Sequence, residues 1–203
     1  MSSNELTERV LVIASGNAGK IREFRQLLAH LPLSVQAQPK DLAVEETGQT
    51  FAENARIKAL TVAQATGQWA LADDSGLSVE ALAGAPGVYS ARYAASDALR
   101  IKRLLRELKG IDDRRAHFSA ALCIASETNE VLLEVEGRCE GLITHAARGE
   151  KGFGYDPIFE VNATGTTFAE MTIEQKRQWS HRGCAFALLD PALQELLHKQ
   201  NKP

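Results

Sequence analysis

The chain has 203 residues, of which 44% are hydrophobic and 24% charged, and its formal net charge is −3 at pH 7. These values are typical of a globular protein that can bury a substantial core, as one domain or as two closely packed lobes. The mild negative charge excludes a protein that binds duplex nucleic acid through a general basic field.

The first third of the chain predicts one strand and two helices. The run RVLVIAS at 9–15 is short, apolar and rich in β-branched residues, as in a buried strand. A helix is expected over 19–31, where apolar residues recur on one face until Pro32 ends it. A second helix is expected over 50–67, because it opens with a Thr-x-x-Glu capping pattern and closes at Gly67.

The middle of the chain predicts a third helix between β-rich segments. WALA at 69–72 reads as a short strand that leads directly into DDSG. GAPGVYSARY at 84–93 is interpreted as a packing turn, and 96–110 as a helix. Two β-rich segments at 116–126 and 130–141 are joined by ETN, which predicts a hairpin.

The last quarter predicts a loop and two helices. The loop is expected at 148–159 and the helices at 172–180 and 184–199, the second interrupted near Asp190 and Pro191. Strands that alternate with helices around a central hairpin favour a mixed α/β fold over a parallel doubly wound sheet. We therefore expect a single domain over residues 1–203, with a twisted central sheet flanked by helices and two lobes around a central substrate cleft. Residues 1–9 are expected to be flexible.

The stretch SGNAGK at 15–20 joins the first predicted strand to the first helix. A glycine turn at a helix N-terminus presents backbone N–H groups to an anion, and Lys20 adds a positive charge. The spacing from Gly16 to Gly19 is too short for a G-x-x-x-x-G-K-[ST] loop, and Ile21 follows Lys20, which argues against a P-loop ATPase or kinase. Alone, the motif is equally consistent with a tight turn that carries a surface lysine.

The adjacent carboxylates Asp73 and Asp74 follow an apolar strand, in the region where α/β proteins place ligands. In a strand their side chains point to opposite faces, so only one easily faces a given ligand. A carboxylate there could hold Mg²⁺ or accept a proton from water, and Glu45 and Glu46 could add oxygen ligands. The alternatives are an Asp-rich turn and a solvated acidic loop.

Three further groups could contribute to a site. Asn54 and Lys58 share one face of a helix, which is an ordinary polar surface unless that helix lines the cleft. GFGYDP at 152–157 holds two aromatic residues between glycines, which could stack on a base or only anchor a turn. SHRG at 180–183 makes a dense set of donors together with Lys176, although a lone histidine is more often structural.

These blocks, in this order, resemble the inosine/xanthosine triphosphate pyrophosphatase family. The resemblance covers essentially the whole chain, from Val10 to Leu197, and rests on six motifs. They are SGNAGK (15–20), EETGQTFAENARIKA (45–59), ADDSGL (72–77), GAPGVYSARY (84–93), GFGYDPIF (152–159) and SHRG (180–183).

The resemblance implies a homodimer of two-lobed α/β protomers that uses Mg²⁺ to hydrolyse ITP, dITP and XTP between the α and β phosphates. It implies that Asp74 and Lys20 are catalytic, with Asp74 as proton acceptor and metal partner and Glu45 or Glu46 completing the metal site. The substrate-binding residues that it implies are Ser15, Gly16, Asn17, Ala18, Gly19, Lys20, Asn54, Lys58, Ser75, Phe153, Gly154, Tyr155, Asp156, Lys176, His181 and Arg182.

The implied base preference agrees with hydrogen-bond chemistry. Arg182 and Lys176 only donate, so they suit the oxygen at position 6 of hypoxanthine and not the amino group of adenine. The predicted helix 96–110 is more basic than is usual in the family, and it is expected to lie outside the chemistry.

The chain is expected to be cytoplasmic, with a small-molecule nucleotide as its ligand and neither nucleic acid nor a membrane as a partner. Its three cysteines form no C-x-x-C pair, which points to a reducing compartment, and no apolar run approaches the roughly 20 residues of a membrane span. One alternative is a related pyrophosphatase for other nucleotides, such as modified pyrimidines, and the complete SHRG and FGYD motifs argue against it. Another is a nucleotide-sensing protein without turnover, and the pair of Asp74 and Lys20 argues against that.

Overall fold

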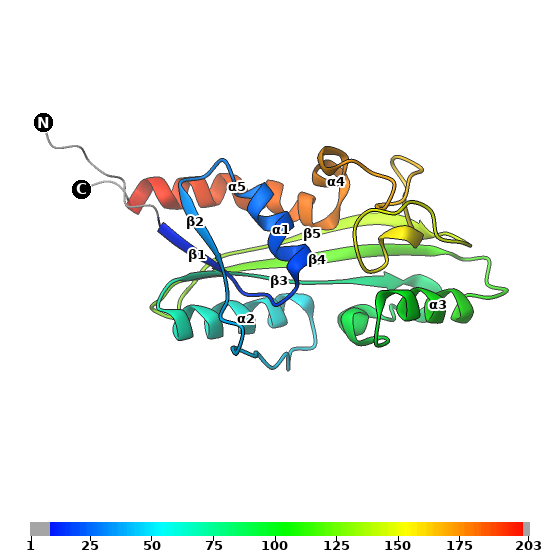
Figure 1. Cartoon of the computed structure of the whole chain (residues 1–203), viewed down its shortest axis with the longest axis horizontal. Coiled ribbons are helices and arrows are strands. Elements are labelled where there is room, and N and C mark those ends of the chain that lie inside the picture. The colour runs from blue at the N-terminus through cyan, green and yellow to red at the C-terminus, as the bar shows by residue number, and fades with distance from the viewer. Residues whose placement is uncertain (1–8, 201–203) are drawn as a thin grey trace, which may run out of the picture.

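One six-stranded sheet organises the chain, and the computed structural model describes residues 9–200 (Figure 1). The sheet order is β2-β1-β3-β4-β5-β6, with β1 parallel to β2 and β3 and all other pairs antiparallel. The predicted mixed α/β fold and the central hairpin are thus confirmed. The strands are β1 (Arg9–Ile13), β2 (Leu33–Ala37), β3 (Trp69–Val79), β4 (Arg115–Ala125), β5 (Val131–Ile143) and β6 (Phe159–Val161).

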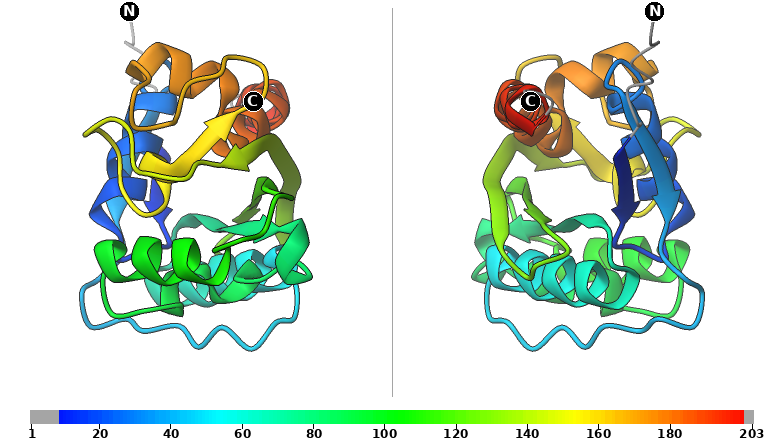
Figure 2. Two further views of the ribbon diagram at one scale, coloured as in Figure 1. Left: turned by 90° about the vertical axis from the view of Figure 1, so that its right-hand side faces the viewer. Right: turned by 90° about the vertical axis from the view of Figure 1, so that its left-hand side faces the viewer.

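Helices cover both faces of this sheet (Figures 1 and 2). One face carries α1 and α5, with α4 beside them, and the opposite face carries α2 and α3. Among the described residues, none of the helices combines the length and the apolar character needed to cross a membrane. The helices are α1 (Ala18–Leu27), α2 (Phe51–Thr66), α3 (Asp97–Glu107), α4 (Ile173–Trp179) and α5 (His181–Gln200).

Successive side chains along a strand point to opposite faces of the sheet, and this alternation divides the core into a cluster on each face. On β3, Trp69 and Leu71 pack towards α1 and α5, whereas Ala70 and Ala72 pack towards α2. A third cluster lies at the other end of the long strands β3, β4 and β5, around Phe159 and other aromatic residues. Burial on both faces explains the apolar runs at the start of β3 and along β4, whereas β5 alternates between buried and exposed residues.

Several predicted boundaries were wrong. The strand predicted at 69–72 continues to Val79, because DDSG pairs with β4 in register instead of forming a turn. The first helix ends at Leu27, before Pro32, and α5 runs without interruption through Pro191 because Leu189 and Leu193 pack into the core on either side of it.

Other differences concern short or terminal segments. The short edge strands β2 and β6 were not predicted, since five and three residues carry little periodicity. The segment 84–93 contains a short 3₁₀ helix, Gly87–Arg92. The predicted flexibility of residues 1–9 falls outside the described residues except at Arg9, which begins β1.

The start of α5 lies directly against β5 at Gly137. A Cβ atom added to Gly137 would be 2.2 Å from the backbone nitrogen of Ala185 and 2.3 Å from the carbonyl oxygen of His181. Neither backbone atom can move without displacing the helix. Gly137 therefore fixes how closely α5, and the SHRG motif at its start, approaches the sheet.

We predict that Gly137→Ala lowers the free energy of unfolding by about 2 kcal/mol, because it overpacks this contact. Urea denaturation of the variant and the parent measures the difference. Arg138→Ala, at the exposed neighbouring position, is the control and should change stability little. Equal stability of Gly137→Ala and the parent would contradict the close helix contact.

Candidate active site

The site begins where β1 leaves the sheet. The pairing of β1 with β3 stops at Ile13 and Leu71, whereas β3 continues to Val79. Beyond Leu71 the edge of β3 on the side of β1 is therefore open, and Asp73 and Asp74 are the first charged residues along it. The chain that leaves β1 forms SGNAGK beside this edge, so the two motifs meet at the carboxyl end of a parallel strand.

Asp73 lies at the centre of a buried ion cluster on the face of α1 and α5. Its Oδ2 atom is 2.9 Å from Nζ of Lys20 and 3.0 Å from Nη2 of Arg182, and it is the acceptor for the hydroxyl of Ser75 at 3.3 Å. Only 2% of Asp73 is exposed. Burial alone would raise its pKa, but Arg182 and Lys20 hold the pKa of this carboxyl well below its ordinary value, so it remains charged.

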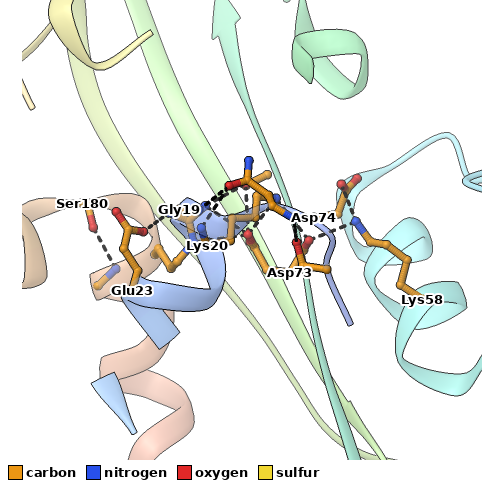
Figure 3. Close-up of polar contacts among 12 residues, drawn as sticks. Gly19, Lys20, Glu23, Lys58, Asp73, Asp74 and Ser180 are labelled. Carbon is orange, nitrogen blue, oxygen red and sulfur yellow. Dashed lines mark hydrogen bonds and ion pairs between the residues drawn. The ribbon is translucent and has the colours of Figure 1, made fainter. Parts of the chain in front are cut away.

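Asp74 points to the opposite face, towards α2. Its Oδ1 atom is 2.9 Å from Nζ of Lys58, and its Oδ2 atom accepts a hydrogen bond of 3.1 Å from the amide of Asn54 (Figure 3). Burial raises the pKa of Asp74 above its ordinary value, although Lys58 opposes the shift. A carboxylate with a raised pKa is a stronger proton acceptor than an exposed one.

Lys58 joins Asp74 to one of the two candidate glutamates. Its Nζ atom is 2.9 Å from Oε1 of Glu46, and although burial opposes it, the pair of carboxylates raises the pKa of Lys58. Glu46 is half-buried and faces the site, whereas Glu45 is exposed and does not line the cavities described below. Only one member of the predicted glutamate pair is therefore placed to act.

Two lysines from opposite faces of the sheet meet at one backbone atom. The carbonyl oxygen of Asp73 accepts hydrogen bonds from Nζ of Lys58 at 3.0 Å and from Nζ of Lys20 at 3.3 Å. This is possible only because β1 no longer occupies that edge. The open edge thus gathers two positive charges next to the Asp74 carboxylate (Figure 3).

The turn SGNAGK begins α1 through its asparagine. Oδ1 of Asn17 accepts hydrogen bonds from the backbone nitrogens of Gly19 and Lys20, and Ser15 accepts one from Asn17. Asn17 therefore caps the helix and already satisfies two of its first amides. Gly16 and Ala18 are exposed.

The aromatic loop, residues 152–156, closes over the start of α1. A Cβ atom added to Gly19 would lie 2.8 Å from Cδ1 of Phe153, so the glycine lets the ring approach. On its other side the ring is 5.0 Å from Nζ of Lys176, within the range of a cation–π contact. Tyr155, in contrast, is buried in the core and donates to the carbonyl oxygen of Ser90, so Phe153 is the more accessible of the two predicted aromatics.

Lys176 and Arg182 are held by acidic side chains. Lys176 is 2.7 Å from Oδ2 of Asp156 and 2.9 Å from Oε1 of Glu23, and Arg182 donates to Glu23 and Asp73. Asp156 also accepts from the backbone nitrogen of Phe153 at 2.9 Å, which ties the aromatic loop to α4. Burial raises the pKa of Asp156, and Lys176 opposes that shift.

His181 is buried and stacks on Phe118, with ring centroids 4.6 Å apart and an interplanar angle of 13°. Burial and then the charge of Arg182 lower its pKa well below 6.5, so the imidazole is neutral near pH 7. Within residues 9–200 its Nδ1 atom has no hydrogen-bond partner. A neutral imidazole can donate from one nitrogen and accept at the other.

Two adjoining cavities collect these side chains. One, of about 340 Å³, is lined by residues of SGNAGK together with Glu46, Lys58 and Asp74. The other, of about 240 Å³, is lined by Phe153, Lys176 and the SHRG residues His181 and Arg182. The residues common to both linings are Asn17, Lys20, Ser75 and Ala91, so the two cavities form one groove with an acidic and lysine-lined end and an aromatic end.

Sequence reasoning found most of this groove and missed several members. The predicted substrate-binding residues line the two cavities except Ala18, Gly19 and Asn54, and Asn54 is bonded to Asp74. Glu23 and the partner role of Asp73 were missed, although Glu23 is three residues after Lys20 on the same helix. The first turn of helix 96–110 was expected to lie outside the chemistry, yet Asp97 and Arg100 line the aromatic end.

Its relatives place the chain among the nucleoside triphosphate pyrophosphatases. A Ham1 family model matches residues 11–192, and the chain belongs to the Ham1 family. The family predicted from the sequence motifs is thereby confirmed.

Similar proteins cover nearly the whole chain. A "dITP/XTP pyrophosphatase" of Prochlorococcus marinus (strain MIT 9313) is 98% identical over 100% of both chains, and one of Synechococcus sp. (strain CC9311) is 66% identical over 98% of this chain and 95% of its own. The structure of a HAM1 protein from Coxiella burnetii has a TM-score of 0.83 and 43% identity, and covers 92% of this chain and 99% of its own.

We predict that His181 makes the protein less stable in mild acid. The unfolded chain binds a proton at this histidine below about pH 6.5 and the folded chain does not, so stability falls as the pH drops through that value. Between about pH 7.5 and pH 5.5 this amounts to about 1 kcal/mol. Urea denaturation at both values should show a smaller loss in His181→Phe, which keeps a ring against Phe118. His145→Phe, at an exposed histidine, is the control, and an unchanged pH dependence in His181→Phe would refute the prediction.

Proposed function

We propose that this protein hydrolyses non-standard purine nucleoside triphosphates, namely ITP, dITP and XTP, to the monophosphate and pyrophosphate. The observation that carries the proposal is the continuous groove in which Asp74 and two lysines adjoin an aromatic and donor-lined cavity. The similar proteins of Prochlorococcus and Synechococcus are named dITP/XTP pyrophosphatases, which supports dITP and XTP as substrates. Removal of these triphosphates would keep deaminated purines out of nucleic acids.

The lysine-lined end suits the triphosphate. Lys20 and Lys58 converge beside the exposed turn of SGNAGK, whose free backbone amides lie at a helix N-terminus. Phosphoryl transfer depends mainly on positioning and on neutralising negative charge, which fixed lysines provide. Ser15, Gly16 and Ala18 would contact phosphate oxygens, while Asn17 holds the turn in shape.

The chemistry of the donor set fits Mg²⁺ when the substrate is bound. Among the described residues no group of three or more His, Cys, Asp or Glu side chains is arranged around one point to hold a metal. Asp74 and Glu46 offer two carboxylates on either side of Lys58, and Mg²⁺ is commonly held by one or two carboxylates together with substrate phosphates. Bound there, Mg²⁺ would neutralise phosphate charge and acidify a water molecule.

Asp74 would act as the proton acceptor. The oxygen of a water molecule would bond to one phosphorus of the α–β phosphoanhydride while the bond from that phosphorus to the bridging oxygen breaks. The bridging oxygen would leave with the other phosphorus, giving monophosphate and pyrophosphate, and a proton of the water would pass to the Asp74 carboxylate. Asn54 and Lys58 fix the two oxygens of Asp74 and orient it towards the groove. Burial keeps its pKa above the ordinary value, which favours proton uptake.

The aromatic end suits a purine with an oxygen at position 6. Of the five N–H groups of Arg182, four donate to Asp73, Ser75 and Glu23 of the described chain, and one remains. Lys176 likewise uses two of its three donors on Asp156 and Glu23. The remaining donors match a carbonyl oxygen and would face an amino group in adenine, which leaves buried groups unpaired.

The remaining expectations are parts of the same proposal. Family membership supports a single-domain homodimer that works in the cytoplasm. The net charge of −3 and the polar groove support a free nucleotide as ligand, and no nucleic acid or membrane partner is proposed.

The proposal predicts rapid pyrophosphate release from ITP, dITP and XTP, and little from GTP, ATP and dTTP. Release is measured with Mg²⁺ and with excess chelator, and Mg²⁺ should be required. Orthophosphate as the product would overturn the proposed reaction. A preference for ATP or dTTP would overturn the proposed base preference. Tight ITP binding without turnover would indicate a nucleotide sensor.

We expect Asp74→Asn to lower kcat by at least about 100-fold, because the amide cannot accept the proton. The amide keeps the size of the side chain, so circular dichroism and the melting temperature should be nearly unchanged. Asp112→Asn, at an exposed aspartate, is the matched control and should retain full activity. A near-normal kcat in Asp74→Asn would exclude this residue as the proton acceptor.

A further inference from the structure

The first turn of α3 is joined to the aromatic loop by a single carboxylate. Oδ2 of Asp97 accepts a hydrogen bond of 2.7 Å from the backbone nitrogen of Gly154. The other oxygen, Oδ1, is 2.7 Å from Nη1 of Arg100, and both residues line the aromatic end of the groove. The two bonded residues are 57 positions apart in the chain, so this is a tertiary contact and not a helix cap.

Asp97 is the outer of two carboxylates that hold this loop. The inner one, Asp156, accepts from the backbone nitrogen of Phe153 and pairs with Lys176. Gly154 lies between Phe153 and Tyr155 and has a φ of 64°, a conformation that has few local restraints in glycine. The bond from Asp97 therefore restrains the loop at a glycine, whose backbone its own side chain cannot restrain.

The position of this loop decides where the Phe153 ring lies. The ring sits between Gly19, which has room for no Cβ atom beside it, and the ammonium group of Lys176. A shift of the loop by a fraction of an ångström would close or open this slot, because packed contacts tolerate little displacement. The ring also lines the aromatic cavity, where the purine of the proposed substrate would lie, so the affinity for the base depends on the position of the loop.

The hydrogen bond from the backbone of Gly154 contributes more to this contact than the ion pair between Asp97 and Arg100 does. About half of the Asp97 side chain is exposed, at 47%, so its ion pair with Arg100 is screened by water and contributes little. The short bond to the Gly154 N–H is charge-assisted and joins the aromatic loop to α3. Arg100 orients the carboxylate for that bond.

We propose that Asp97 is a positioning residue for base recognition, which holds Gly154 and thereby the Phe153 ring in the geometry that accepts the purine. This inference rests on the proposed function, since it concerns the substrate of the same groove. It places α3 in the specificity machinery and separates its role from that of Asp74, which lies at the other end of the groove.

The experiment compares steady-state ITP hydrolysis by the full-length parent, Asp97→Ala and Asp97→Asn. We expect Asp97→Ala to raise KM for ITP about tenfold with kcat within about twofold, since the loop is displaced while the phosphate end is intact. Asp97→Asn retains an oxygen that can accept from Gly154, and it should restore KM to within about threefold of the parent. Melting temperatures are measured for every variant.

Asp113→Ala is the matched control, because Asp113 also accepts from a backbone nitrogen and pairs with an arginine, Arg115, but lies outside the groove. It should leave KM unchanged. An unchanged KM in Asp97→Ala would overturn the inference. A fall of kcat of about tenfold together with a lower melting temperature would also overturn it, because it would indicate a general structural role. A parent enzyme that releases no pyrophosphate from ITP would instead overturn the proposed function.

Discussion

The structure around the groove depends on one buried charge, the Asp73 carboxylate. A carboxylate that is 2% exposed is stable only when cationic partners replace its lost hydration, and here the partners come from two helices. Lys20 of α1 and Arg182 of α5 both contact Asp73 on β3, so the ion cluster fixes the two helices against the strand. Glu23 and Ser75 accept two further hydrogen bonds from Arg182. The cationic residues that face the groove are therefore oriented before any ligand arrives.

The early end of β1 converts this cluster into a site. A strand that remained paired would have satisfied the backbone of β3 and excluded the lysines. Because the pairing stops at Leu71, the carbonyl of Asp73 is open to Lys20 from one face and Lys58 from the other. The two neighbouring aspartates therefore have different surroundings: Asp73 pairs with Lys20 and Arg182 inside the ion cluster, whereas Asp74 pairs with Lys58 and lines the groove.

Close packing at two glycines fixes the positions of the segments that line the groove. Gly137 allows α5 to approach β5, which sets the position of the SHRG residues. Gly19 allows Phe153 to lie on the start of α1, which brings the aromatic loop next to the turn SGNAGK. Both contacts join segments that are distant in sequence, and both would be blocked by a single methyl group. The shape of the groove thus depends on these close contacts at glycines as well as on its polar side chains.

The sequence by itself determined the fold class, the central hairpin, the capped helix α2 and the six motifs that identify the family. These signals are local: hydrophobic period, capping residues and fixed spacing depend on neighbouring positions. The alternation of strand side chains also predicted correctly that Asp73 and Asp74 face opposite sides.

Only the tertiary structure decided how those motifs are combined. Three features depend on contacts between residues that are not neighbours in the chain. DDSG continues a strand, Glu46 and not Glu45 faces the groove, and Asp97 accepts a hydrogen bond from Gly154. Local propensity favours a turn at DDSG, but ten paired positions with β4 override it. Long-range pairing and burial carry no signature in the neighbouring residues, and for that reason the partners of each charge became known only from the folded chain.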